Sequence, residues 1–235
     1  MWEYQPTLQE LNPKYSKKKT AGQIAIYILL ALYALMLACY IIFNIIYVKA
    51  RVVGFSMQPT YNASLKQDED PEASIYKDNV FANRYNKGTN NDIVLIQNED
   101  GVVIKRIIAT GGQLLRLGKN INGNYSFYLS QNENSEEQLL TEEYVLNHSH
   151  MNASYFERFV SHNRHLKVAE EENQWFTIKI PNNHVFVLGD NRLVSEDSAM
   201  YSTVGVDRIV GKIEISYSYN QNFLGYLWQR FCAMF

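Results

Sequence analysis

The sequence predicts a mainly β protein that is held in a membrane by a single N-terminal transmembrane helix. Two observations carry this prediction: an apolar run at residues 24–48, and several short β-branched runs downstream that turn residues separate. The expected organisation is a cytoplasmic tail at 1–23, the helix at 24–48 and an external all-β domain at 49–235. Residues of about 119–174 break the strand pattern and are expected to form an inserted cap.

The apolar run matches the roughly 20 residues that cross a bilayer as a helix. A cleaved signal peptide has a shorter apolar core, of about 7–15 residues, so the segment is expected to stay attached. More basic residues precede the run than follow it, which places the N-terminus inside and the bulk of the chain outside. The basic residues before it are Lys14, Lys17, Lys18 and Lys19, and those after it are Lys49 and Arg51. We therefore expect a single-pass protein of the cell membrane, with the lipid bilayer as a partner.

The external part contains β-branched segments typical of strands. Residues 98–101 form a Gly-ended hairpin loop between two of these segments. The expected strands cover 92–97, 102–109, 176–180, 185–188 and 208–217. Within the cap, residues 136–146 have some helical periodicity. The aromatic segment at 223–231 is too short to span a membrane, and either lies at the membrane interface or closes the core.

Composition excludes several classes of function. A chain of 235 residues, 46% hydrophobic and with net charge −2, fits one anchor and one globular domain but has no basic field for nucleic acid. Its two cysteines provide no disulfide framework. The histidines lack acidic or Cys partners at a useful spacing, so neither a metal nor a cofactor is expected. They are His148, His150, His162, His165 and His184.

Lys105 is the most informative single residue. It lies inside a β-branched run beside Arg106, and strand alternation puts these two neighbours on opposite faces. With Val103 and Ile107 on its own face, Lys105 is expected in an apolar environment, where desolvation lowers the pKa of the ammonium group. A neutral lysine can act as a general base. The alternative is an edge strand from which both side chains reach water.

Two further segments bear polar groups at defined positions. Ser56 follows the expected membrane helix closely, in a Gly-Phe-Ser-Met-Gln-Pro-Thr segment that can present it from a fixed turn. The apolar run at 185–188 leads into a polar cluster, which needs hydrogen-bond partners at the edge of the core. This cluster contains Gly189, Asp190, Asn191, Arg192, Ser195, Asp197 and Ser198. The alternative for the cluster is a turn that caps its own backbone.

Taken in order, these three segments resemble the boxes of bacterial type I signal peptidases, peptidase family S26. The nucleophile box is Gly54, Ser56, Met57, Pro59 and Thr60. The lysine box runs over 105–112, and the C-terminal box is the polar cluster above. Three boxes in order behind one apolar helix form a specific pattern, which covers the chain from the helix to about residue 212 apart from the cap.

The resemblance implies a membrane-bound serine endopeptidase that removes signal peptides from exported precursors and works as a monomer. Ser56 would be the nucleophile and Lys105 the general base. Ser195 would orient Lys105, Asp190 would pair with Arg106, and Asp197 would support the Ser195 turn. The Ser56 amide and a donor near Gly54 would form the oxyanion hole. Phe55, Met57, Ile107 and Ile108 would line substrate pockets for small residues, beside a sheet edge at 107–110.

Two positions depart from the family pattern, which usually has an acidic residue at Gln113 and arginine at Ala199. If Asp197 normally pairs with that arginine, it needs another partner here. A self-cleaving repressor-type peptidase would have a DNA-binding domain in place of the apolar helix. The remaining alternative is a membrane-tethered β-domain that derives from a signal peptidase and is either a non-catalytic assembly factor or specialised, for instance for pilin-type substrates.

Overall fold

The computed structural model describes residues 21–66, 68, 70, 72, 77–99, 101–120, 122–145, 151–172, 174–219 and 221–232. Most of the expected tail at 1–23, and the pair His148 and His150, lie outside these residues. The chain divides into two compact units, Met1–Ile45 and Ile46–Phe235. Each unit is described separately.

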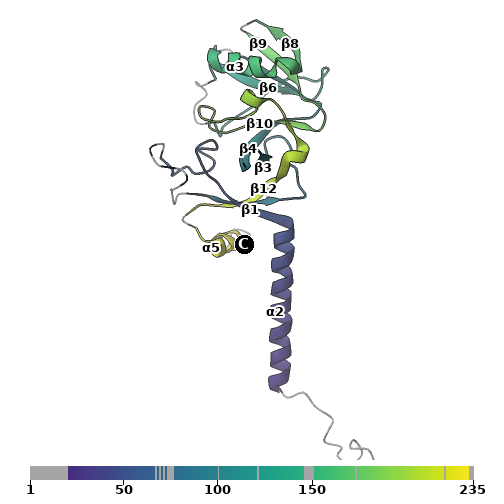
Figure 1. The fold of residues 1–235 in the computed structure, drawn as a ribbon, viewed down its shortest axis with the longest axis vertical. Coiled ribbons are helices and arrows are strands. Elements are labelled where there is room, and N and C mark those ends of the chain that lie inside the picture. The colour runs from purple at the N-terminus through teal and green to yellow at the C-terminus, as the bar shows by residue number, and fades with distance from the viewer. Residues whose placement is uncertain are drawn as a thin grey trace, which may run out of the picture. The chain divides into compact units, whose positions relative to one another are not determined.

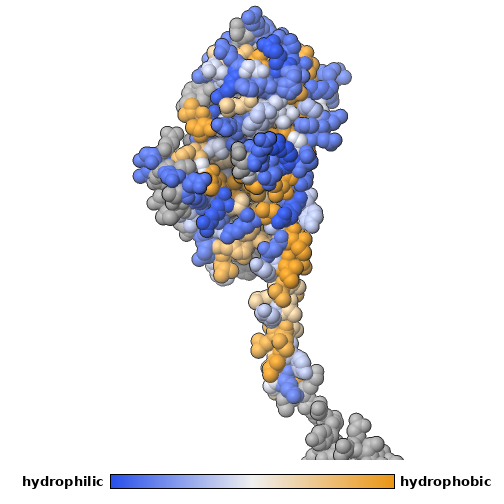
Figure 2. All heavy atoms as spheres, viewed as in Figure 1, coloured by the Kyte–Doolittle hydropathy of each residue, from blue (hydrophilic) through white to orange (hydrophobic). Residues whose placement is uncertain are grey.

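The first unit contains helix α2 (Ala21–Ile46), which has no buried side chain. By length and composition it can cross a bilayer, and Figure 2 shows a mostly hydrophobic surface along it. The helix ends before the expected limit of 48, because Tyr47 and Val48 already belong to strand β1 (Tyr47–Arg51) and pair with Asn83 and Ala82.

The second unit is built on two antiparallel sheets (Figure 1), so the mainly β fold expected from the sequence is confirmed. The larger, seven-stranded sheet has the order β1-β2-β12-β3-β4-β10-β11. The expected hairpin at 92–109 is present as the pair β3–β4, and β12 crosses back to lie between β2 and β3. The other strands of this sheet are β2 (Asn79–Asn83), β3 (Ile93–Asn98), β4 (Gly101–Thr110), β10 (His184–Leu188), β11 (Val204–Gly205) and β12 (Ile209–Tyr217).

The expected cap is a second sheet of five strands, in the order β7-β6-β5-β9-β8. It extends beyond 119–174, since its strands are β5 (Leu114–Lys119), β6 (Tyr125–Ser130), β7 (Gln138–Leu139), β8 (Lys167–Glu171) and β9 (Trp175–Lys179). Helix α3 (Ala153–Asn163) begins at Asn152, whose side chain accepts from the Tyr155 amide, and ends in the 3-10 turn η3 (Arg164–Leu166).

The helical expectation for residues 136–146 is wrong in the described part, 136–145. These residues form β7 and turns, and α3 begins only at Ala153. The aromatic C-terminal segment is helix α5 (Phe223–Cys232). Short helical turns α4 (Ser198–Tyr201) and η4 (Val206–Arg208) join β10, β11 and β12.

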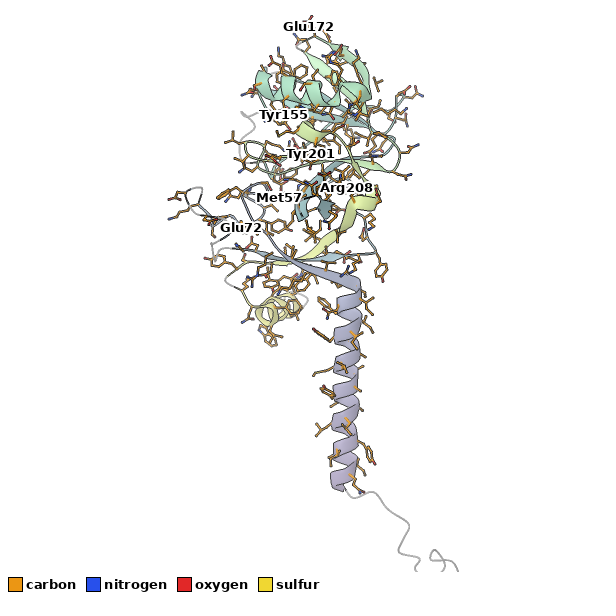
Figure 3. The ribbon with its side chains drawn as sticks, in the orientation of Figure 1. Met57, Glu72, Tyr155, Glu172, Tyr201 and Arg208 are labelled. Carbon is orange, nitrogen blue, oxygen red and sulfur yellow. The ribbon has the colours of Figure 1, made fainter. Side chains whose placement is uncertain are left out.

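One apolar cluster joins the two sheets. Phe159 of α3 is fully buried and packs against Phe127 and Phe176 of the second sheet and Phe186 of the first, with ring centroids 5.8–6.0 Å apart. Two further clusters lie on opposite faces of the first sheet. Tyr155, labelled in Figure 3, belongs to the cluster that joins the sheets, whereas Met57, also labelled, belongs to one of the clusters on the first sheet alone.

Candidate active site

Ser56 lies in a turn that hydrogen bonds fix from two sides. Gly54 opens the turn with φ +85°, a conformation that favours glycine. Behind the turn, the buried Asn62 donates its side-chain amide to the carbonyls of Val52 (2.8 Å) and Gly54 (3.2 Å). In front, the Ser56 carbonyl accepts from the Asn191 amide at 3.0 Å. The turn therefore holds half-buried Ser56 against the C-terminal polar cluster.

Lys105 is buried on β4, with 4% of its surface exposed. Its Nζ donates to Ser195 Oγ at 3.1 Å, and its face-mates Val103 and Ile107 pack in an apolar cluster, as alternation predicted. Burial lowers the pKa of Lys105, an effect that the negative charges of Asp197, Glu196 and Asp190 only partly offset. Among the described residues, no hydrogen bond joins Lys105 Nζ to Ser56 Oγ.

The Ser195 hydroxyl and the Ser56 carbonyl both lie against Gly189. A Cβ at position 189 would overlap Ser195 Oγ and lie 2.5 Å from the Ser56 carbonyl oxygen, so only glycine fits here. The Gly189 amide donates to Asp197 Oδ2 at 3.0 Å, and Asp197 also caps α4 by accepting from the Ala199 amide. The structure thus brings Ser56, Lys105 and Ser195 together around one glycine, with Asp197 holding that glycine in place.

Arg106 points to the other face of β4 and is also buried. It forms a two-pronged pair with Asp190, with Nε–Oδ1 at 2.8 Å and Nη2–Oδ2 at 2.6 Å. Thr60 Oγ1 donates to the same carboxylate at 2.5 Å, which ties the Ser56 turn to the pair. The expected pairing of Asp190 and Arg106 is therefore present, with Thr60 as an additional member.

Glu142 and Tyr144, which the sequence reasoning missed, contact this site from the segment that follows β7 of the second sheet. Glu142 pairs with the fully buried Arg192 at 2.5 Å, and Arg192 Nε donates to the Gly189 carbonyl at 2.9 Å. The ring of Tyr144 lies 3.9 Å from the Arg106 guanidinium carbon. No local pattern predicts the Glu142–Arg192 pair, since the chain between them contains α3 and the three strands β8, β9 and β10.

The expected substrate-lining residues do not share one surface. Ile107 and Ile108 are buried in clusters on opposite faces of β4, and Met57 is only 2% exposed. Phe55 is half-buried beside Ser56. Residues 107–110, expected at a sheet edge, pair with β10 on one side, whereas on the other side the pairing with β3 ends at Arg106.

The first half of β4 has an unpaired side too. Strand β3 pairs with residues 101–106, but β10 stops at Arg106, so no described strand pairs with the other side of 101–105. A cavity of about 340 Å³ adjoins Val103 of this stretch. Its lining includes Tyr201 and Arg208, which Figure 3 labels. The side of residues 101–105 that leads to Lys105 therefore has no partner among the described strands.

Comparison with known proteins decides the family. The sequence profile described as "Signal peptidase, peptidase S26" matches residues 24–218, which is most of the chain. The chain belongs to the signal peptidase family. It is 27% identical over 171 residues to signal peptidase I V of Bacillus subtilis, covering 72% of this chain and 85% of that protein. The crystal structure of a signal peptidase I from Enterococcus faecalis aligns at 23% identity and TM-score 0.34, over 54% of this chain and 97% of that one.

Membership of this family makes the chain a serine hydrolase of the signal peptidase class, as the sequence indicated. The two departures from the signal peptidase pattern are accommodated locally. The Oε1 atom of buried Gln113 accepts from the Thr110 amide at 2.7 Å, and its Nε2 atom donates to Gln131 at 2.9 Å. Ala199 is buried in the cluster that joins the sheets, and Asp197 takes main-chain amides as partners. Within the described residues, no group of His, Cys, Asp or Glu is arranged to hold a metal ion.

Proposed function

We propose that this chain is a membrane-bound endopeptidase that removes N-terminal signal peptides from exported precursors, using Ser56 as nucleophile and Lys105 as general base. The supporting observation is the buried Lys105, whose pKa is lowered by burial and whose Nζ is held by Ser195 next to the Ser56 turn. A lysine in this state can be neutral nearer to physiological pH than the exposed group, and a neutral amine can accept a proton.

The proposed reaction proceeds in two steps. Ser56 Oγ attacks the scissile carbonyl while Lys105 takes its proton, and Lys105 then protonates the departing amine as the C–N bond breaks. A water molecule, deprotonated by Lys105, attacks the acyl-enzyme, and Ser56 regains its proton. Ser195 positions Lys105 throughout. The Ser56 amide, which donates to no described residue, would bind the oxyanion with a second donor near Gly54.

The precursor would bind as an extended strand along the open side of residues 101–105, which leads directly to Lys105. Main-chain hydrogen bonds along this edge would hold the peptide in register. Small residues before the cut would be selected sterically, because the apolar side chains around the Ser56 turn, such as Met57, are already closely packed.

Helix α2 would span the cell membrane and place the second unit outside, with the enzyme acting as a monomer. The support is the length and composition of α2 and the excess of lysines before it in the sequence. Because β1 follows α2 without a linker, Ser56 is tethered to the bilayer that also holds its substrates.

The test is cleavage of a signal-peptide precursor in proteoliposomes by Ser56→Ala and Lys105→Met variants of the full chain. Methionine keeps the apolar volume of the lysine stem, so the fold should persist. Loss of a general base costs about 10²–10⁴ in rate, and Ser56→Ala should reduce cleavage to background. Ser161→Ala and Lys179→Ala, at exposed positions, are the matched controls.

Near-normal cleavage by folded Lys105→Met would exclude Lys105 as the base. Absence of cleavage by the unchanged chain would favour one of two alternatives. The chain would then be a non-catalytic assembly factor derived from a signal peptidase, or a signal peptidase specialised for other substrates, such as pilin-type proteins. The non-catalytic alternative has no specific support, since Ser56 and Lys105 are both retained.

A further inference from the structure

Helix α3 carries an asparagine on its buried face, which consists of Tyr155, Phe156, Phe159 and Asn163. Asn163 is fully buried, with 0% of its surface exposed. Its Nδ2 atom donates to the Phe159 carbonyl at 3.0 Å and to the Ser198 carbonyl of α4 at 3.2 Å. Within the described residues, its Oδ1 atom has no hydrogen-bond partner. A buried amide with an unpaired oxygen lowers the free energy of unfolding, so stability alone does not favour asparagine at this position.

The far end of α4 is held in a similar way. His165, in the turn η3 directly after α3, has its Nε2 atom 3.3 Å from the hydroxyl of Ser202, the residue that ends α4. Ser202 is 8% exposed and has φ +68° and ψ −156°, a conformation that a residue with a side chain adopts only where its surroundings maintain it. Between the two ends, Ala199 packs in the cluster that contains Phe159. Residues of α3 and η3 thus fix α4 at both ends and along its apolar side.

The start of α4 in turn holds the end of β10. The Val187 amide donates to Ser198 Oγ at 3.0 Å, and the Gly189 amide donates to Asp197 Oδ2 at 3.0 Å. Both bonds join a main-chain amide at the end of the strand to a side chain of α4 or of its N-cap. A shift of α4 would therefore lengthen these bonds and displace the loop between Gly189 and Asp197, which contains Ser195.

We propose that Asn163 and His165 are positioning residues, which act through α4 to keep Ser195 Oγ in place for Lys105. Ser195 is 5% exposed and its hydroxyl accepts from Lys105 Nζ at 3.1 Å, near the upper end of the normal range, so a small displacement of the loop breaks that bond. The effect on the reaction is indirect, because it passes through α4. The inference deepens the proposed function and rests on it, since it concerns the orientation of the proposed general base.

The first test is a double-mutant cycle on precursor cleavage by the full chain in proteoliposomes, with kcat taken per folded molecule. Asn163→Leu keeps the branched shape of the side chain and removes the donor, so kcat should fall about tenfold with KM little changed. In a Ser195→Ala background the same substitution should change kcat by less than about twofold, because the group that Asn163 positions is absent. Arg164→Ala, at the exposed position between the two residues, is the control. A fall in kcat that multiplies fully with that of Ser195→Ala would overturn the proposal.

His165→Ala tests the other end of α4 at an exposed position, where the substitution leaves the fold intact. It should lower kcat by about threefold, since a contact of an exposed side chain contributes less than a buried one. No further loss is expected in the Ser195→Ala background. If Asn163→Leu does not fold, His165→Ala alone decides the proposal by the same criterion.

Amide hydrogen exchange of the full chain in detergent, resolved to single residues, tests the contact without a substrate. Asn163→Leu should speed exchange of the Val187 and Gly189 amides about tenfold, whereas Arg164→Ala should leave both unchanged. Unchanged exchange in Asn163→Leu, with precursor cleavage present, would overturn the inference and leave the proposed function standing. Absence of cleavage by the unchanged chain would refute the proposed function, and faster exchange would then show that the contact between α3 and α4 is only structural.

Discussion

The two sheets of the second unit bury different kinds of side chain. The second sheet is filled with aromatic residues, and its ion pairs, such as Lys179–Glu133, lie at the surface. The first sheet buries charge where β4 meets β10: Lys105, Arg106 and Asp190 are all less than 10% exposed. Glu142 is the one buried acidic residue that the structure describes outside the first sheet's polar cluster, and it points into that cluster through Arg192. One sheet therefore contributes a largely aromatic core, and the other holds the buried polar groups of the candidate site.

The largest expected effect is a loss of unfolding free energy when the aromatic core of the second sheet is truncated. Phe159→Ala removes the ring that contacts both sheets, and truncating such a buried phenylalanine costs about 4 kcal/mol of unfolding free energy. Chemical denaturation of the full chain in detergent measures this cost. Leu139→Ala, at a 54% exposed position, is the control and should cost little. A rate per folded molecule that fell as steeply as the stability would show that the second sheet does more than support the first.

A smaller loss is expected where the two regions meet. Glu142→Gln leaves the buried Arg192 charge without its counter-charge, which costs about 3 kcal/mol. Because Arg192 holds the Gly189 carbonyl, the cleavage rate of the folded fraction should also fall. Glu133→Gln breaks an exposed pair and should cost no more than about 1 kcal/mol. Equal effects of the two substitutions on stability would remove the distinction between the buried and the exposed ion pairs.

The smallest effect concerns the pH dependence of the first sheet alone. The exposed Glu196 raises the pKa of Lys105, against the larger lowering by burial. Glu196→Gln removes that charge, so the pKa of Lys105 falls further and the acid limb of kcat/KM against pH moves to lower pH. Added salt should shrink the difference from the unchanged chain. Glu172→Gln, in the second sheet's hairpin, should leave the profile unchanged; a shift toward higher pH in Glu196→Gln would contradict the role of Lys105.

The sequence predicted several contacts of the first sheet's polar cluster and little of the second sheet. The hairpin β3–β4, the burial of Lys105 and the pairing of Asp190 with Arg106 all follow from alternation or from the three boxes. Strands β5 and β6 were missed because Leu114–Lys119 (Leu-Leu-Arg-Leu-Gly-Lys) and Tyr125–Ser130 (Tyr-Ser-Phe-Tyr-Leu-Ser) contain no β-branched residue.

The sequence of helix α3 does contain features that predict a helix, although the helix was expected at residues 136–146 instead. Asn152 is a good N-cap, and Tyr155, Phe156 and Phe159 have the spacing of one buried helical face. The Glu142–Arg192 contact had no such signal. It depends on how the second sheet folds back over the first, which is a tertiary property that a single sequence without an alignment does not encode locally.

The open side of residues 101–105 has a consequence for the chemical diversity of substrates. A main chain presents the same donors and acceptors whatever side chains it carries, so an edge of this kind is nearly blind to sequence along most of a bound peptide. Its strict requirement is for an N–H at each paired position, which proline alone lacks. If precursors bind along this edge as proposed, it can serve many unrelated export signals while excluding imino acids from the paired positions.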